Sequence, residues 1–178
     1  MVAGELYVAS DPELVRERAQ ARDLVARYNA IGQDDQAGRR VLLAELLAQV
    51  GEDAWIEPPF YCDYGWNISL GERAFLNFNC VILDCAAVEI GAGSMLGPAV
   101  QLCAATHPVD PAERATGLEY ARPIVIGTNV WIGAGAIVGA GVTVGDDAVI
   151  GAGSIVLRDI PARVFAAGNP CRVIRTLP

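Results

Sequence analysis

The sequence contains a single histidine, His107, which is followed by Pro108. Imidazole changes charge between about pH 5 and 8, so a neutral His107 could act as a general base and take a proton from an attacking hydroxyl group. Proline favours an extended backbone for the residue before it, so we expect His107 in a loop and not at a buried strand corner. One histidine per chain excludes a metal site that needs two or three imidazoles from one chain.

The five cysteines are the other potentially reactive side chains: Cys62, Cys80, Cys85, Cys103 and Cys171. Their number is odd and no pair has C-x-x-C spacing, so neither a disulfide framework nor a thiolate zinc site is indicated. We expect small, buried side chains without chemistry. Cys103 lies four residues before His107 and raises the alternative of a nucleophilic thiol. Its place in the repeat described below is one that glycine usually occupies, which disfavours that alternative.

Charge is unevenly distributed along the chain. The 13 basic residues are all arginine, and with 21 acidic residues they give a net charge of −8. Residues 1–123 carry nine arginines and eighteen acids, a net charge of −9, whereas residues 124–178 carry four arginines and three acids, a net charge of +1. The acidic total argues against nucleic-acid binding and against a polybasic membrane-surface protein. An anionic ligand should favour the C-terminal third.

The chain has no targeting or membrane signal that the sequence makes visible. It starts with neither a basic segment nor an apolar one, so no secretory signal is indicated. No apolar stretch approaches the 18 residues that a membrane span requires. The expected location is the cytoplasm.

The first 52 residues predict a helical hairpin that caps the rest of the chain. Two N-cap candidates, Ser10 and Asp11, precede a proline and a run of apolar residues at helical spacing, which predicts a helix from about residue 11 to 30. Asp34 or Asp35 can begin a second helix with a stripe of leucines. Two short helices bury little surface alone, so we expect them to pack against the following residues.

From residue 124 onward, an aliphatic residue followed by glycine recurs every six positions, at Ile126-Gly127, Ile132-Gly133, Val138-Gly139, Val144-Gly145 and Ile150-Gly151. The same frame continues backwards at Ile90, Leu96 and Leu102 and, offset by two residues, at Leu70, Leu76 and Ile82. We expect an irregular corner near residues 85–87, where the offset falls.

A six-residue period suits a coil with flat sides, in which each side is a short strand with an inward aliphatic residue and each corner is a tight turn. Three sides close one turn of the coil, and successive turns stack as parallel strands about 4.8 Å apart. We therefore predict a mainly β chain, with a parallel β-helix over residues 53–178 that is interrupted by a loop insertion at residues 105–123. The spacing alone does not fix the hand of the coil.

Several segments beside the repeats resemble the maltose/galactoside O-acetyltransferase branch of the hexapeptide-repeat acyltransferases, which includes the nodulation acetyltransferases. They are residues 3–7 (AGELY), 55–60 (WIEPPF), 62–65 (CDYG), 77–79 (NFN), 106–108 (THP), 129–133 (NVWIG) and 168–172 (GNPCR). The resemblance implies a left-handed β-helix and a homotrimer with active sites between subunits. It also implies direct transfer of acetyl from acetyl-CoA to a sugar hydroxyl in a ternary complex, with no metal.

The resemblance assigns roles to matching positions. His107 would be the catalytic base, and the backbone N–H of Ala134 is a candidate donor to the oxyanion. The positions that contact the acceptor sugar in the family hold Asn77, Asp84, Asp63 and Glu119. Those that contact coenzyme A hold Ala134, Ala152, Leu157, Arg158, Arg172 and Arg175, with Arg172 and Arg175 the best candidates for phosphate. Leu157 replaces a threonine that is frequent in the family, so a hydroxyl contact would be missing there.

Other functions remain open. A relative that acetylates a non-sugar hydroxyl or an amine, such as an antibiotic or an amino sugar, would share the repeats, Trp131 and the loop histidine, although the hairpin favours the sugar branch. A non-catalytic β-solenoid would bind no acetyl-CoA. A metal hydratase with histidines pooled across a trimer is disfavoured by the single His107. Galactoside enzymes have an acid where this chain has Cys85, which disfavours a preference for galactosides.

Overall fold

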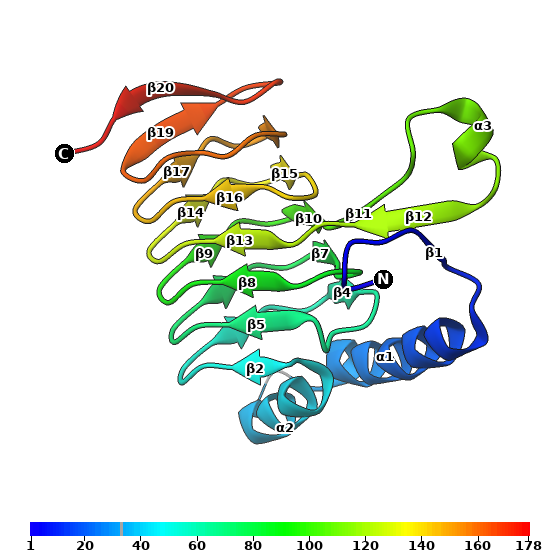
Figure 1. Cartoon of the computed structure of the whole chain (residues 1–178). Coiled ribbons are helices and arrows are strands. Elements are labelled where there is room, and N and C mark those ends of the chain that lie inside the picture. The colour runs from blue at the N-terminus through cyan, green and yellow to red at the C-terminus, as the bar shows by residue number, and fades with distance from the viewer. Residues whose placement is uncertain (33) are drawn as a thin grey trace.

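The computed structural model describes residues 1–32 and 34–178. The chain forms a three-sided coil, and two helices pack against its first turn (Figure 1). Helix α1 (Pro12–Ala30) begins after Asp11, whose carboxylate accepts the N–H of Glu13. Helix α2 (Gln36–Leu46) begins after Asp35, whose carboxylate accepts the N–H of Gly38. These N-caps confirm the predicted hairpin. In the described residues, no helix has the length and apolar character needed to cross a membrane.

The coil has three faces, numbered here in the order in which the chain visits them. The first face contains β2 (Gln49–Val50), β5 (Ile68–Leu70), β8 (Val88–Ile90), β13 (Ile124–Ile126) and β16 (Thr143–Val144). The second contains β3 (Trp55–Ile56), β6 (Phe75–Leu76), β9 (Met95–Leu96), β14 (Trp131–Ile132), β17 (Val149–Ile150), β19 (Val164–Ala167) and the antiparallel β20 (Arg172–Thr176). The third contains β4 (Phe60–Cys62), β7 (Cys80–Leu83), β10 (Gln101–Cys103), β15 (Ile137–Val138) and β18 (Ile155–Val156).

This is the left-handed parallel β-helix expected from the sequence, and the aliphatic residues of the hexads form its core. They are Leu70, Leu76, Ile82, Ile90, Leu96, Leu102, Ile126, Ile132, Val138, Val144, Ile150 and Val156, and each is at most 2% exposed. The two-residue offset falls between β7 and β8, where residues 84–87 form the irregular corner that the sequence predicted. The first face already begins at Gln49, slightly before the predicted domain boundary at residue 53.

The insertion forms an arm that extends from the side of the coil (Figure 1). It contains β11 (Ala105–Thr106), the short helix α3 (Pro111–Arg114) and β12 (Leu118–Ala121). Strand β12 pairs antiparallel with β11 on one side and with the N-terminal strand β1 (Tyr7–Val8) on the other. The N-terminus of the chain is therefore attached to the arm.

Two corners flank the third face and carry the candidate site residues. The 2–3 corner consists of residues 77–79, 97–100, 133–136 and 151–154, and the 3–1 corner consists of residues 63–67, 84–87, 104–123, 139–142 and 157–159. Stacking at the 2–3 corner is close. A Cβ atom on Gly97 would lie 2.7 Å from the amide nitrogen of Ala134, and one on Gly133 would lie 2.5 Å from that of Ala152, so glycine is required at both positions.

A buried arginine joins the hairpin to the coil. Arg39 of α2 is 2% exposed, and its guanidinium carbon lies 5.7 Å from the ring centre of Tyr28 in α1 and 5.5 Å from that of Trp55 in β3. Its Nη2 donates to the carbonyl of Ile31 at 3.2 Å. The cation is thus compensated by two aromatic faces and a carbonyl group.

Replacing Arg39 with alanine should lower the free energy of unfolding by about 3 kcal/mol, because it leaves a cavity and removes both cation–π contacts. Urea denaturation followed by circular dichroism measures the change. Arg40→Ala is the matched control, since Arg40 is an exposed neighbour and its loss should change stability by less than about 0.5 kcal/mol. Equal losses in the two variants would contradict this account of the hairpin.

Candidate active site

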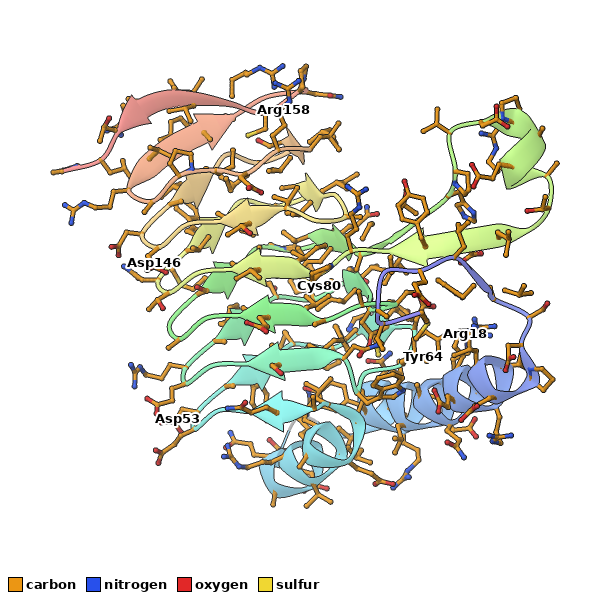
Figure 2. The ribbon with its side chains drawn as sticks, in the orientation of Figure 1. Arg18, Asp53, Tyr64, Cys80, Asp146 and Arg158 are labelled. Carbon is orange, nitrogen blue, oxygen red and sulfur yellow. The ribbon has the colours of Figure 1, made fainter. Side chains whose placement is uncertain are left out.

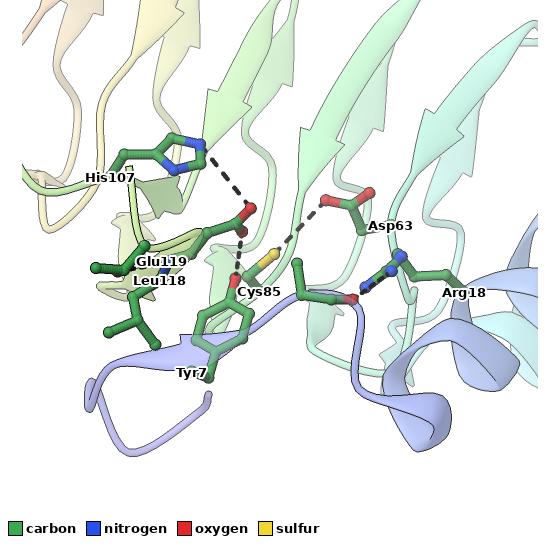
Figure 3. Close-up of polar contacts among 9 residues, drawn as sticks. Tyr7, Arg18, Asp63, Cys85, His107, Leu118 and Glu119 are labelled. Carbon is green, nitrogen blue, oxygen red and sulfur yellow. Dashed lines mark hydrogen bonds and ion pairs between the residues drawn. The ribbon is translucent and has the colours of Figure 1, made fainter. Parts of the chain in front are cut away.

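The 3–1 corner brings several of the predicted site residues together. Asp63, Asp84 and His107 follow β4, β7 and β10, which are consecutive strands of the third face, so their corners stack on one another. Figure 3 places His107, Glu119 and Asp63 in one neighbourhood beside Cys85. The His107 side chain is 55% exposed, as the loop position predicted.

His107 faces a carboxylate of the arm. Its Nε2 lies 4.0 Å from Oε1 of Glu119, and the other carboxylate oxygen, Oε2, accepts a hydrogen bond of 3.1 Å from the hydroxyl of Tyr7 (Figure 3). Burial raises the pKa of Tyr7 well above its usual value, so the phenol keeps its proton and donates. Tyr7 belongs to one of the segments that resemble the family, but no role at the site was predicted for it, since nothing local indicates that β1 pairs with the arm.

Asp63 lies between a buried thiol and the arginines of α1. Its Oδ2 is 3.6 Å from Sγ of Cys85. Burial raises the pKa of Asp63, an effect that the Cys85 contact and the nearby Arg18 and Arg22 oppose. Arg18 itself donates to the carbonyl of Ala9 at 2.6 Å, which ties α1 to the N-terminal segment. The sequence did not predict this contribution from α1.

The thiols of this region are poor nucleophiles. Burial raises the pKa of Cys85 to about 12 and also raises the pKa of Cys103 above its usual value. Both side chains therefore carry a proton near neutral pH, and a thiol is much less reactive than a thiolate. This disfavours the nucleophilic alternative for Cys103.

Asp84 is fully buried against the 63–67 corner. Its Oδ1 accepts the backbone N–H groups of Asp63 at 3.0 Å and Tyr64 at 2.9 Å. The sequence placed Asp84 among the residues that contact the acceptor, whereas the structure places its carboxylate where it holds the corner that presents Asp63. Burial raises the pKa of Asp84 to about 6, against the usual 3.8.

Because that pKa is raised, the contribution of Asp84 to stability is complete below about pH 4 and is lost as the pH rises through about 6. Asp84→Asn keeps an oxygen for both N–H groups and cannot ionise. The free energy of unfolding of the variant, relative to that of the parent, should therefore increase by about 1 kcal/mol when the pH is raised from 5 to 7.5. Urea denaturation of both proteins at the two pH values tests this, and an unchanged difference between them would refute it.

The 2–3 corner holds a second group of predicted residues. Ala134 and Ala152 are exposed, and within residues 1–32 and 34–178 no acceptor takes the N–H of Ala134. Asn77 is half-buried, and its Oδ1 accepts the N–H of Phe78. Strands of two to four residues separate this corner from the 3–1 corner, a distance of about 10 Å at 3.3 Å per residue. Within one chain, Asn77 and Ala134 are therefore not beside His107.

The remaining predicted residues lie toward the C-terminal end of the coil, where Figure 2 marks Arg158. Arg158, Arg172 and Arg175 are exposed, and Leu157 is 64% exposed. A groove of about 390 Å³ lies between the base of the arm and the third face. Leu157 lines it together with Cys103, Thr106 and Tyr120, so the groove connects this end of the coil with the arm.

Comparison with known proteins places the chain in a family. The model "Maltose acetyltransferase hexapeptide capping motif" matches residues 1–51, and "Bacterial transferase hexapeptide (six repeats)" matches residues 123–158. The chain is 51% identical to Nodulation protein L of Rhizobium meliloti (strain 1021), over 97% of this chain and 94% of that protein. It belongs to the maltose/galactoside O-acetyltransferase branch of the hexapeptide-repeat acyltransferases.

Solved structures of similar acetyltransferases agree with this. A maltose O-acetyltransferase from Clostridium difficile 630 is 44% identical with a TM-score of 0.98, covering 99% of this chain and 95% of that one. A galactoside acetyltransferase in complex with coenzyme A is 44% identical with a TM-score of 0.96, covering 99% of this chain and 88% of that one. The present chain is therefore an acetyl-CoA-dependent acetyltransferase of the galactoside/maltose type.

Proposed function

We propose that this acetyltransferase moves the acetyl group of acetyl-CoA to a sugar hydroxyl, with His107 as the general base. The position of His107 carries the proposal: the only histidine of the chain is half-exposed at the base of the arm, beside the corner that presents Asp63. An imidazole in this place can meet a bound acceptor, take its proton and return it. We also propose a cytoplasmic location, where acetyl-CoA is available.

In the proposed reaction both substrates are bound at the same time. Neutral His107 takes the proton of the acceptor hydroxyl while the hydroxyl oxygen attacks the thioester carbon. The negative charge of the tetrahedral intermediate accepts a hydrogen bond from the N–H of Ala134. The carbon–sulfur bond then breaks, and His107 returns its proton to the departing sulfur. The protonated thiols of Cys85 and Cys103 are consistent with a path that has no covalent enzyme intermediate.

One chain does not bring His107 and Ala134 together, because they lie at opposite edges of the third face. We propose a homotrimer in which the third faces turn toward a common axis, so that the 3–1 corner of each chain meets the 2–3 corner of the next. A head-to-tail contact of this kind closes after three chains and creates three equivalent sites. Each site would then contain His107 from one chain and Asn77 and Ala134 from its neighbour.

The side chains that point outward from the faces indicate which of them suits contact with other chains. Those of the third face are mainly apolar: Tyr61, Val81, Gln101, Ile137 and Ile155. Those of the first face are mainly polar: Gln49, Ser69, Glu89, Val125 and Thr143. Those of the second face are also apolar: Trp55, Phe75, Met95, Trp131 and Val149. An apolar surface is better covered and a polar one better solvated, so the first face is the least suited to contact other chains. We choose the third face over the second because the third lies between the two corners that carry His107 and Ala134.

The exposed arginines suit coenzyme A, since guanidinium groups bind phosphates through paired hydrogen bonds. We propose that Arg172 and Arg175, with Arg158, bind the phosphate groups. The groove beside Leu157 has room for part of the pantetheine chain and leads toward the arm. Ala152 offers a backbone contact on the 2–3 corner. On the acceptor side, Asn77 and Asp63 would bind sugar hydroxyls, with Asp84 supporting Asp63.

A coenzyme A release assay over a panel of acceptors tests the proposed function. The panel contains maltose, glucosides, galactosides, amino sugars and chito-oligosaccharides, and mass spectrometry identifies the product. We expect sugar esters, with maltose and glucosides preferred because Cys85 replaces the acid of the galactoside enzymes. Exclusive acetylation of amines would favour the antibiotic or amino-sugar alternative. Absence of acetyl-CoA binding in calorimetry would favour a non-catalytic solenoid.

A further inference from the structure

Three residues lie side by side across the three-stranded sheet of the arm. Tyr7 of β1 is directly opposite Glu119 of β12, and Thr106 of β11 is directly opposite Tyr120. The second pairing, continued by one residue, places His107 opposite Glu119. Directly opposite residues of an antiparallel pair project to the same side of the sheet. The side chains of Tyr7, Glu119 and His107 therefore share one side, in that order.

Glu119 contacts both of its neighbours. Its Oε2 accepts the hydroxyl of Tyr7 at 3.1 Å, and its Oε1 lies 4.0 Å from Nε2 of His107 (Figure 3). The Glu119 side chain is 22% exposed, whereas that of His107 is 55% exposed. The carboxylate is thus held on the inner side of the imidazole, and the outer side of the ring remains open to an acceptor.

We infer that Glu119 and Tyr7 position His107 for proton transfer, which makes the N-terminal strand part of the catalytic apparatus. The inference rests on the proposed role of His107 as the base. When the imidazole of His107 takes a proton, it becomes a cation that faces the carboxylate of Glu119. The two opposite charges attract each other, and this attraction is absent while the ring is neutral. The carboxylate therefore stabilises the charge that develops in the transition state more than it stabilises the ground state.

Tyr7 has a separate task in this arrangement. Its hydroxyl fixes one oxygen of Glu119 and so directs the other toward His107. Because burial raises the pKa of Tyr7, the hydroxyl remains a donor. Tyr7 of β1 contacts Glu119, and Glu119 in turn faces His107. The N-terminal segment would then contribute to catalysis as well as cover the first turn of the coil.

Two conservative variants test the inference. Glu119→Gln can still accept the Tyr7 hydroxyl but cannot balance a cation, and kcat should fall about 100-fold, the scale of a misplaced catalytic group. Tyr7→Phe keeps the ring and its packing, and kcat should fall about tenfold through looser placement of the carboxylate. The KM values for acetyl-CoA and acceptor should stay within about twofold of the parent. Glu113→Gln, an exposed position on α3 of the same arm, is the matched control and should leave kcat unchanged.

The result that overturns the inference is equally specific. If Glu119 is instead an acceptor contact, Glu119→Gln will raise the acceptor KM and largely retain kcat. In a His107→Ala background, Glu119→Gln and Tyr7→Phe should cause no further loss, because both act through the imidazole. Additive losses would refute this. If His107→Ala abolishes turnover while Glu119→Gln retains kcat, the positioning role alone fails; if His107→Ala retains turnover, the proposed function fails as well.

Discussion

Replacing His107 with alanine is expected to lower kcat/KM for acetyl transfer by about a thousandfold, within the 10²–10⁴-fold range of a lost general base. The acceptor hydroxyl is a weak nucleophile until its proton is removed, and the sequence offers no second histidine to take that proton. The loss should appear in kcat. The KM for acetyl-CoA should stay close to the parent value, because the arginines proposed for its phosphates lie on β20 and in the corner after β18, and not on the arm.

Thiol release at saturating acetyl-CoA and acceptor measures the effect. His107 is half-exposed, so its removal should leave the melting temperature close to that of the parent, and a loss of activity will not reflect unfolding. Imidazole added to the variant should restore part of the rate, since it can enter the open side of the site and act as the base. Unchanged turnover by His107→Ala would remove the proposed mechanism.

The coil was predictable because its periodicity is local. One aliphatic residue in each hexad is enough to fill the interior, and Leu70, Ile82, Leu102 and Val138 all appear there. The two-residue offset was predictable for the same reason. The inward aliphatic residues continue on both sides of the offset, so the two extra residues must lie in a corner and not in a strand. The hand of the coil was not readable from spacing, and it came from the resemblance to a family.

The contacts that complete the site were not predictable, because they join distant segments with no periodic signal. The hydrogen bond between Tyr7 and Glu119 spans 112 positions. Nothing in the local sequence shows that β1 would pair with the arm or that Arg18 of α1 would bind the carbonyl of Ala9. Asp84 illustrates a different limit, because a polar residue in a corner can face inward or outward. Its carboxylate faces inward, where it accepts the backbone N–H groups of Asp63 and Tyr64 in the adjacent turn of the coil, and the sequence does not show that these groups are available.

The division of the site between two corners leads to a prediction about mixed oligomers. His107→Ala chains and Asn77→Ala chains should each be poorly active alone, and mixing them should restore activity. In the proposed trimer a site takes His107 from one chain and Asn77 from the next, so some sites in a mixed trimer contain both native residues. Random assembly of equal amounts leaves about a quarter of the sites intact. Every trimer that contains both kinds of chain has one intact site of three, so mixed trimers freed of the other species should reach about a third of the parent rate per site.

The experiment uses co-expressed chains with two different affinity tags, purified on both tags so that only mixed oligomers are assayed for thiol release. The control pairs His107→Ala with a chain that carries both His107→Ala and Asn77→Ala, because no site in that mixture has His107 and activity should stay at the background. Recovery in the first mixture alone would require that neighbouring chains share each site. If mixed oligomers are isolated and remain as inactive as the control, His107 and Asn77 belong to one chain's site, and the third face does not turn toward a common axis.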